Sequence, residues 1–246
     1  MKKLITLLML CAAAHAHELT ERELQDVKIV QRPGSQIPLD LPFTDAEGKA
    51  VTLKDSFRGP PVLLIPIDYT CKMLCEALSN GVAGALRESP LKPGKDYRVT
   101  FFSIDPKASP KDTQATAGRL PGGDYLTGTQ SSIEALARSI GFQTRRDPKT
   151  GEIAHPAGFV VVQPDGKIFR YFSGVTFSAN ELTAAIESAA KGEPPPSPID
   201  QLVYLCFHYN PARSAYGPLV MKLTRGLALA TLVLIVAVVI RSRRSK

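Results

Sequence analysis

Continuous apolar runs alternate with helically spaced apolar residues through the middle of the chain. The runs predict strands buried on both faces, over residues 61–67, 97–104 and 158–163. Apolar residues at every fourth position predict a helix over residues 71–87, and a helical pattern predicts another over residues 131–140. A short helix is expected over residues 113–119, and a last helix over residues 180–190, capped by Ser178 or Asn180. A hairpin is expected over residues 36–53, and a returning strand over residues 167–172. Helices between buried strands predict an α/β fold, and hairpins at both ends of the pattern indicate a mixed sheet.

The first 16 residues have the pattern of a secretory signal peptide. Their sequence, MKKLITLLMLCAAAHA, combines a basic start, an apolar run and a small-x-small cleavage site that ends at Ala16. A lipoprotein signal acylated at Cys11 is disfavoured, because the preceding Leu10 is too large for that role. Cleavage would make His17 the first residue of the mature chain, and the polar segment 17–34 is expected to be mobile at its start.

The C-terminal end of the chain predicts a membrane anchor. A run without charged residues, apolar except for Thr231, covers residues 226–240. A span over 219–240 is long enough if Lys222 and Arg225 extend toward one membrane surface. A buried core helix is the alternative, but such a helix would not be apolar all round and then end in RSRRSK. The positive-inside rule places this basic tail in the cytoplasm. Together with the export signal, this predicts an inner-membrane protein with one span and a soluble domain in the periplasm.

A proline-rich stretch separates the predicted folded region from the predicted anchor. The sequence GEPPPSP at residues 192–198 is typical of a stiff, extended linker. We therefore expect a signal peptide at 1–16, a folded domain at 17–191, a linker and juxtamembrane segment at 192–218, a transmembrane helix at 219–240 and a basic tail at 241–246.

The distribution of charge argues against a nucleic-acid partner. The chain has 30 basic and 23 acidic residues, a formal charge of +7. Eight of the basic residues lie in the terminal segments 1–16 and 219–246, which contain no acidic residue, so 22 basic residues remain against 23 acidic ones elsewhere. The body of the protein therefore carries a net charge of −1 and lacks the basic surface that binds nucleic acids.

Cys71 and Cys75 form the strongest chemical feature of the sequence. They follow a predicted buried strand and open a predicted helix, where a spacing of four residues places them on one helical face. The N–H groups of a helix N-terminus favour a thiolate. Such a pair can close a disulfide or hold a soft metal ion such as Cu(I) or Zn(II). Two buried cysteines that merely pack as small apolar side chains would not explain this spacing at this position.

A third ligand is expected from His155. Pro156 disfavours a helix at this position, so the histidine is placed on a loop just before a predicted strand. A loop histidine is often an ordinary surface residue, but the only other histidines of the mature chain are His17 and His208. Two thiolates and an imidazole suit three-coordinate Cu(I), and they suit Cu(II) when a further oxygen ligand is added.

Three segments in order, DYTCKMLC, FSIDPKASP and HPAGFVVVQPDGKIFRYFSG, resemble the Sco/SenC/PrrC family of copper-binding proteins. The resemblance covers roughly residues 36–190 and implies a thioredoxin-like fold. It implies copper ligation by Cys71, Cys75 and His155, and delivery of the copper to the dinuclear CuA centre of cytochrome c oxidase. Asp105 matches an acidic position of the family near the site. It is expected to adjust the properties of the copper site and not to be a primary copper ligand.

Residues next to the cysteines extend this expectation and also depart from the family. Asp68 and Tyr69 lie shortly before Cys71 and Cys75. They are candidates for orienting the ligand side chains without binding the metal themselves. Lys72 stands where the family usually has a proline after the first cysteine, so the first helical turn is expected to be less rigid and the thiolates to have a cation nearby. A cleavable signal and a C-terminal anchor replace the N-terminal anchor of many family members.

A second group of copper-binding residue types lies before the predicted anchor. Cys206 and His208, with Met221 further on, are candidate accessory copper ligands that the linker could fold back toward the domain. The alternative, which we favour, is a juxtamembrane aromatic belt formed by Tyr204, Phe207, Tyr209 and Tyr216.

Two functions of different classes fit these residues. The first is a copper chaperone that serves the copper-bearing oxidase subunit, alone or with other periplasmic copper chaperones, and needs no enzymatic turnover. The second is a thiol–disulfide oxidoreductase, in which one cysteine attacks the disulfide of the oxidase copper-site cysteines and the other resolves it, with thiol reductases as further partners. His155 and the four-residue spacing favour the chaperone, because a simple dithiol reductase needs no histidine and commonly uses CxxC. A peroxidase is disfavoured, since the sequence offers no further peroxidatic arrangement.

Overall fold

The computed structural model describes residues 26–71, 73–117, 120 and 122–197, together with the single residues 226, 231 and 241. Contacts within the chain divide it into two units, Met1–Pro195 and Pro196–Lys246. The fold below is that of the first unit. The predicted signal peptide at 1–16 and almost all of the predicted transmembrane helix at 219–240 lie outside the described residues.

A five-stranded mixed sheet forms the centre of the domain. Its strands are β4 (Val62–Ile67), β5 (Arg98–Ser103), β6 (Asp124–Leu126), β10 (Gly158–Val162) and β11 (Ile168–Ser173), and their order is β11-β10-β4-β5-β6. The strands β4, β5 and β6 are parallel, whereas β10 is antiparallel to both β4 and β11. All residues of β4 and β10 are buried, as continuous apolar runs require.

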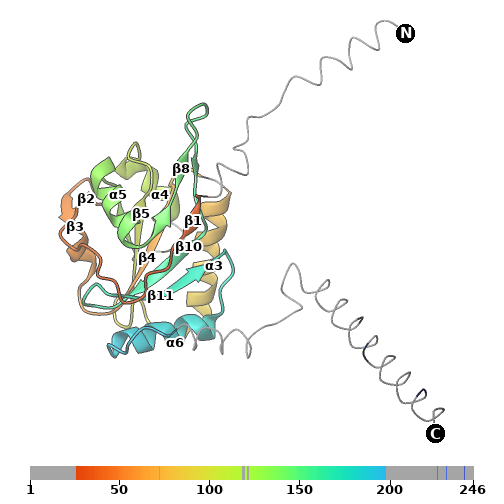
Figure 1. Cartoon of the computed structure of the whole chain (residues 1–246). Coiled ribbons are helices and arrows are strands. Elements are labelled where there is room, and N and C mark those ends of the chain that lie inside the picture. Colours follow the sequence, from red (N-terminus) through yellow and green to blue (C-terminus); the bar gives the residue numbers. More distant parts are fainter. Residues whose placement is uncertain are drawn as a thin grey trace, which may run out of the picture. The chain divides into compact units, whose positions relative to one another are not determined.

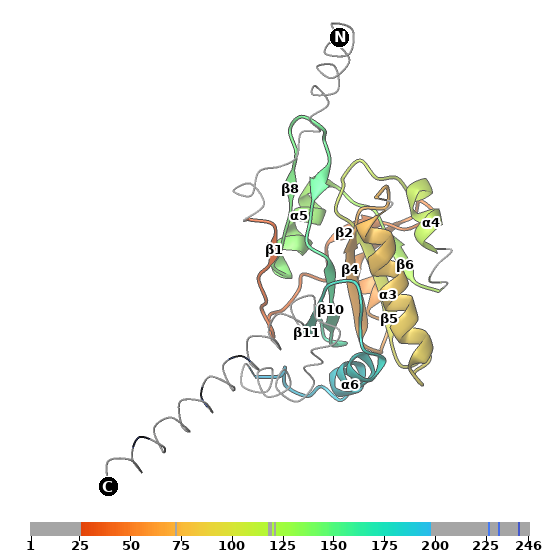
Figure 2. The ribbon, with the colours of Figure 1, turned by 90° about the vertical axis from the view of Figure 1, so that its right-hand side faces the viewer.

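Helices cover both faces of this sheet (Figures 1 and 2). The helices α3 (Leu74–Glu88) and α6 (Ala179–Ala190) pack on one face, against a core that includes Leu63, Ile65 and Phe101. The helix α5 (Gln130–Ser139) packs on the other face, against a second core that includes Leu64 and Phe102. Neighbouring strand residues thus point into opposite cores, as the two-residue period of a strand demands.

Shorter elements surround the sheet. They are β1 (Lys28–Ile29) paired with β7 (Phe142–Gln143), β2 (Pro42–Thr44) with β3 (Ala50–Thr52), β8 (Arg145–Arg146) with β9 (Ile153–Ala154), the 3₁₀ helices at Leu53–Ser56 and Pro110–Thr113, and α4 (Gln114–Ala117). Strands of two or three residues leave no periodic signal, so the sequence does not predict β1, β6, β7, β8 or β9. The pairing of β1 with β7 places the later part of the segment 17–34 on the domain, while the start of that segment, where mobility is expected, lies outside the described residues.

The long elements confirm the predicted α/β pattern, with one consequential shift. The helix α3 begins at Leu74, after Met73 as N-cap, and not at Cys71. Cys71 lies in a turn before the helix, where its N–H donates to the carbonyl oxygen of Asp68 at 3.1 Å. Only Cys75 is helical, so the two cysteines do not share one helical face.

Within the part of the chain that the structure describes, no helix has the length and apolar character needed to cross a bilayer. The predicted span at 219–240 falls almost wholly outside that part.

Close packing of α3 against the loop that follows β11 leads to a testable difference between two glycines of this helix. A Cβ atom at Gly81 would lie 1.9 Å from the carbonyl oxygen of Val175, whereas a Cβ at Gly84 would meet only the end of the Arg87 side chain at 3.9 Å. We expect Gly81→Ala to lower the free energy of unfolding by about 1–3 kcal/mol, because backbone must move. Gly84→Ala should raise it by about 0.5–1 kcal/mol through helix propensity. Urea titration monitored by circular dichroism measures both, and equal stabilities would contradict this packing.

Candidate metal centre

The cysteine loop lies at the carboxyl end of β4. This strand ends at Ile67, residues 68–73 form the connection, and α3 begins at Leu74. A strand that runs directly into a helix exposes the helix N-terminus at the edge of the sheet. Cys75 therefore lies in the first turn of α3, and Cys71 lies in the connection just before it.

Strand pairing brings His155 to the same edge of the sheet. His155 lies between the end of β9 and the start of β10, 80 residues after Cys75. Because β10 runs antiparallel to β4, with Val160 opposite Leu64 and Val162 opposite Val62, the start of β10 lies beside the end of β4. The histidine is thus delivered to the cysteine loop by the hydrogen-bonded register of two central strands.

The three side chains converge on one small volume. The Sγ atoms of Cys71 and Cys75 and a ring nitrogen of His155 all lie within 4.8 Å of one another. The His155 Nε2 is 3.4 Å from the Cys75 Sγ, and its Nδ1 is 3.0 Å from the carbonyl oxygen of Pro156. A carbonyl oxygen only accepts, so Nδ1 carries the proton and Nε2 presents its lone pair to the cysteines. This is the tautomer that a metal ligand at Nε2 requires.

The two thiols differ in their surroundings. The Cys75 side chain is buried, and its Sγ accepts a hydrogen bond from the N–H of Asp68 at 3.4 Å. Burial raises the pKa of the Cys75 thiol and outweighs the opposing effect of that hydrogen bond. The expectation that the helix N-terminus favours a thiolate is therefore wrong for Cys75, where burial has the larger effect on the pKa. A metal ion that binds there must displace a proton.

Exposed apolar side chains flank the more accessible cysteine. Cys71 is half-buried, and the neighbouring Met73 and Leu74 are 83% and 37% exposed. Among the described residues, only Val30 joins them as a large hydrophobic residue that is exposed. Apolar side chains held in water beside a ligand set are typical of a surface that another protein contacts.

Asp68 and Tyr69 shape the connection from within. The Asp68 carboxylate accepts hydrogen bonds from the Thr70 N–H and hydroxyl at 2.9 and 2.7 Å, which fixes the turn, while its own N–H contacts Cys75. The Tyr69 hydroxyl lies on the core side, 3.2 Å from the carbonyl oxygen of Phe101 and 3.3 Å from that of Leu126. Tyr69 therefore anchors the loop to β5 and β6 and directs its hydroxyl away from the ligands.

Within the described part of the chain, the Asp105 carboxylate forms no hydrogen bond with Cys71, Cys75 or His155. It follows β5, the strand beside β4, and its Oδ1 accepts a hydrogen bond from Arg146 at 2.7 Å. Arg146 is not indicated by the sequence, because one arginine in a polar loop gives no signal until the fold shows its partner. Lys72, Cys206 and His208 lie outside the described residues.

The unequal burial of the two thiols predicts an order of chemical modification. In the reduced, metal-free protein, iodoacetamide should modify Cys71 first. Its rate at Cys75 should be at least about tenfold lower, because Cys75 is buried and remains protonated at neutral pH. Raising the pH should speed labelling at Cys75, since a raised pKa leaves less thiolate at any lower pH. Peptide mapping by mass spectrometry separates the sites, and equal rates would contradict the asymmetry.

Comparisons with known proteins agree with this geometry. A family model described as SCO1/SenC matches residues 31–191. A SCO1 protein homologue of Bacillus subtilis is 30% identical over 156 residues, which cover 60% of this chain and 80% of that protein.

Two solved structures share the fold. BsSco, described as a member of the Sco family of cytochrome c oxidase assembly proteins in which a disulfide switch was identified, is 25% identical with a TM-score of 0.52, over 66% of this chain and 98% of its own. ScoI of Bradyrhizobium japonicum, solved with copper bound, is 24% identical with a TM-score of 0.52, over 63% of this chain and 99% of its own. The domain thus has the mixed, thioredoxin-like α/β fold of these proteins. The chain belongs to the SCO1/SenC family.

Proposed function

We propose that this protein binds copper through Cys71, Cys75 and His155 and delivers it during assembly of the CuA centre of cytochrome c oxidase. The observation that carries the proposal is the convergence of two thiol sulfurs and one imidazole nitrogen within 4.8 Å. Family membership supports it, because BsSco is described as one of the oxidase assembly proteins and ScoI of Bradyrhizobium japonicum holds copper.

The chemistry of this donor set suits copper as cargo. Two thiolates and one imidazole are soft ligands, which select Cu(I) over hard cations such as Mg²⁺ or Ca²⁺. Three donors satisfy Cu(I), and a further oxygen ligand would complete a site for Cu(II). The Pro156 carbonyl holds the imidazole in the tautomer that presents Nε2, so the histidine needs no rearrangement of its proton to bind.

Transfer requires a route by which a partner's ligands can reach the metal. Cys71 is the more accessible thiol, and the exposed Met73 and Leu74 lie in the same segment. A partner that covers this apolar surface would bring its own cysteines or histidines next to Cys71, and the copper could then exchange ligand by ligand. We infer that the copper-bearing oxidase subunit docks on this side. Another periplasmic copper chaperone could dock there instead and pass the copper on to the oxidase.

Thiol–disulfide exchange is the second candidate function, and the unbonded cysteines favour it. Cys71 and Cys75 are both free thiols and their sulfurs lie within 4.8 Å. The thiolate of Cys71 would attack a partner disulfide and form a mixed disulfide, and Cys75 would then displace the partner's thiol. The partner gains two electrons and two protons, and this chain is left with a Cys71–Cys75 disulfide that a thiol reductase must reduce. The two functions are compatible, because a CuA site accepts copper only when its cysteines are reduced.

We also propose that the protein is exported and then anchored in the inner membrane by residues 219–240, with the copper domain in the periplasm and residues 241–246 in the cytoplasm. The N-terminal pattern of basic, apolar and small residues and the basic tail after the C-terminal apolar run support this arrangement. Anchoring would hold the domain near a membrane-bound oxidase and raise its effective concentration there.

Substitution of the ligands tests copper binding. Cys71→Ala and Cys75→Ala should abolish retention of one copper per chain, and His155→Ala should weaken it by about 100-fold or more, because an open two-thiolate site remains. The reduced full-length chain is loaded with Cu(I), desalted, and assayed by metal analysis and competition with a chromogenic chelator.

Cys206→Ser provides the matched control, because it removes a thiol outside the three-residue group. This variant should retain copper as the unmodified chain does. Unchanged affinity in His155→Ala would contradict the three-ligand site, and no copper in the unmodified chain, with rapid disulfide exchange instead, would favour the reductase.

Truncation tests the anchor. The full-length chain should remain in the membrane pellet after an alkaline carbonate wash, whereas a chain ending at residue 198 should appear in the soluble periplasmic fraction, because it lacks the apolar run. Recovery of both chains in the same fraction would contradict C-terminal anchoring.

A further inference from the structure

The position of His155 depends on a hairpin that projects from the domain. The strands β8 and β9 form this hairpin, with Arg145 opposite Ala154 and Arg146 opposite Ile153. Figures 1 and 2 show it extending beyond the central sheet. His155 follows β9 directly, so any movement of the hairpin is transmitted to the imidazole from its N-terminal side.

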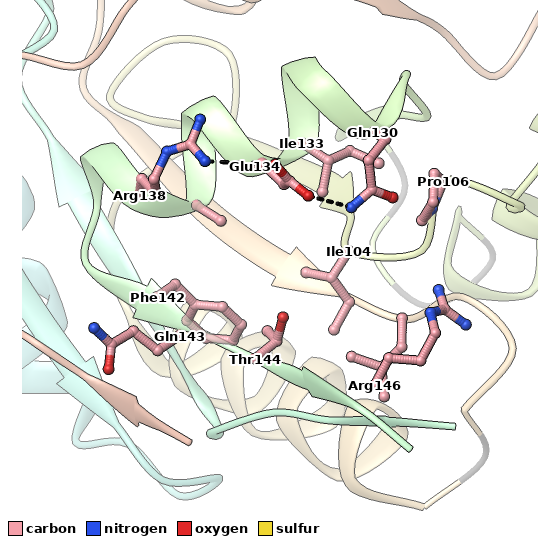
Figure 3. Close-up of a pocket in the computed structure, with 12 residues that line it drawn as sticks. Ile104, Pro106, Gln130, Ile133, Glu134, Arg138, Phe142, Gln143, Thr144 and Arg146 are labelled. Carbon is pink, nitrogen blue, oxygen red and sulfur yellow. Dashed lines mark hydrogen bonds and ion pairs between the residues drawn. The ribbon is translucent and has the colours of Figure 1, made fainter. Parts of the chain in front are cut away.

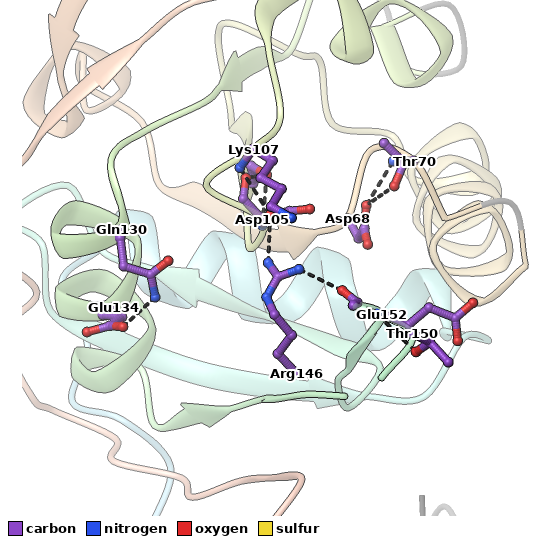
Figure 4. Close-up of polar contacts among 11 residues, drawn as sticks. Asp68, Thr70, Asp105, Lys107, Gln130, Glu134, Arg146, Thr150 and Glu152 are labelled. Atoms are coloured by element: carbon purple, nitrogen blue, oxygen red, sulfur yellow. Dashed lines mark hydrogen bonds and ion pairs between the residues drawn. The ribbon is translucent and has the colours of Figure 1, made fainter. Parts of the chain in front are cut away.

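One guanidinium group connects the hairpin to the sheet (Figure 4). The Nη1 of Arg146 donates to the carbonyl oxygen of Gly151, across the hairpin turn, at 2.6 Å. Its Nη2 donates to the Oδ1 of Asp105 at 2.7 Å. A lysine could not reproduce both contacts equally well, because only the planar guanidinium offers several donors in fixed directions.

Asp105 is a firm attachment point. Its N–H donates to the hydroxyl of Ser103 at 3.0 Å, and that hydroxyl donates to the carbonyl oxygen of Asp105 at 2.8 Å. The neighbouring Ile104 N–H donates to the carbonyl oxygen of Ile67 at 2.8 Å, at the end of the strand that leads to the cysteines. Arg146 therefore joins the histidine hairpin to the same strand ends that carry the cysteine loop.

The hairpin does not close tightly on the helix behind it. A cavity of about 350 Å³ lies between α5, the end of β5 and the segment 142–146. Figure 3 shows Arg146 at one end of this cavity and Arg138 on the helix across from it. Because apolar packing is incomplete here, a polar contact has more influence on where the hairpin lies.

We propose that Arg146 is a positioning residue, which holds the His155 hairpin to Asp105 and thereby sets the rate at which copper leaves the site. The inference rests on the proposed copper function and adds to it a specific control over release. With the contact intact, Nε2 stays near the Cys75 sulfur, as the 3.4 Å separation shows. With the contact broken, the imidazole is free to move away and the copper is left on two thiolates.

The experiment compares three variants of the full-length chain. Arg146→Gln removes both contacts of the guanidinium, and Arg146→Lys keeps the positive charge beside Asp105. Arg138→Gln is the matched control: it removes the same charge from the rim of the same cavity, and Arg138 pairs with Glu134 on its own helix at 3.4 Å and not with the hairpin.

Release of Cu(I) to an excess of a chromogenic chelator is the main measurement. We expect release to be roughly fivefold faster for Arg146→Gln, about twofold faster for Arg146→Lys, and unchanged for Arg138→Gln.

Added salt should speed release from the unmodified chain and have little effect on Arg146→Gln, because the exposed ion pair is then already absent. The Cu(II) electron paramagnetic resonance spectrum of Arg146→Gln should show a partial loss of nitrogen coupling, because the imidazole is away from the metal for part of the time, and a general loss of stability would not produce this change.

Hydrogen exchange in the metal-free chains tests the contact without copper. Amides of residues 145–154 should exchange faster in Arg146→Gln than in Arg138→Gln, while those of β4 and α3 remain unchanged. Equal release rates and equal exchange for the two glutamine variants would overturn the proposal, even if copper binds normally. Failure of the unmodified chain to retain copper, with faster hairpin exchange in Arg146→Gln, would instead overturn the copper function and leave the positioning contact established.

Discussion

The antiparallel pairing of β10 with β4 is the constraint on which the candidate site depends. Cys71 and Cys75 follow the end of β4, and His155 precedes the start of β10. Only antiparallel neighbours place the end of one strand beside the start of the other. The register, with Val160 opposite Leu64, is held by buried backbone hydrogen bonds and by side chains in both cores. A slip of one residue would exchange the two faces of β10, so core packing fixes the ligand geometry.

The site combines a rigid and an accessible side. Cys75 is buried, belongs to the first turn of α3 and receives a hydrogen bond from the backbone of Asp68. Cys71 lies in the connecting turn, beside the exposed Met73. One ligand is therefore held by the fold and the other faces a potential partner. Structural metal sites are commonly closed, whereas this asymmetry leaves one side open and supports the proposed transfer of copper to a partner.

The histidine side of the site is held less firmly than the cysteine side. Downstream of His155 the chain enters β10, which is buried throughout, but upstream it belongs to a projecting hairpin next to a cavity. The Arg146–Asp105 contact joins this hairpin to the end of β5. Downstream of His155 the chain is held by strand pairing, and upstream the exposed Arg146 guanidinium helps to hold the hairpin, so we expect the upstream side to move more easily.

Local patterns predict the α/β class, the long strands and helices, and the candidate ligands Cys71 and Cys75, because buried strands, amphipathic helices and closely spaced cysteines can be recognised among nearby residues. His155 is a candidate because the mature chain has few other histidines and because of the family resemblance. Tertiary structure decided the rest. Three features depend on residues far apart in the chain: the raised pKa of Cys75, the inward hydroxyl of Tyr69 and the partnership of Arg146 with Asp105. Burial and long-range pairing arise only when the strands assemble, so no local pattern carries them.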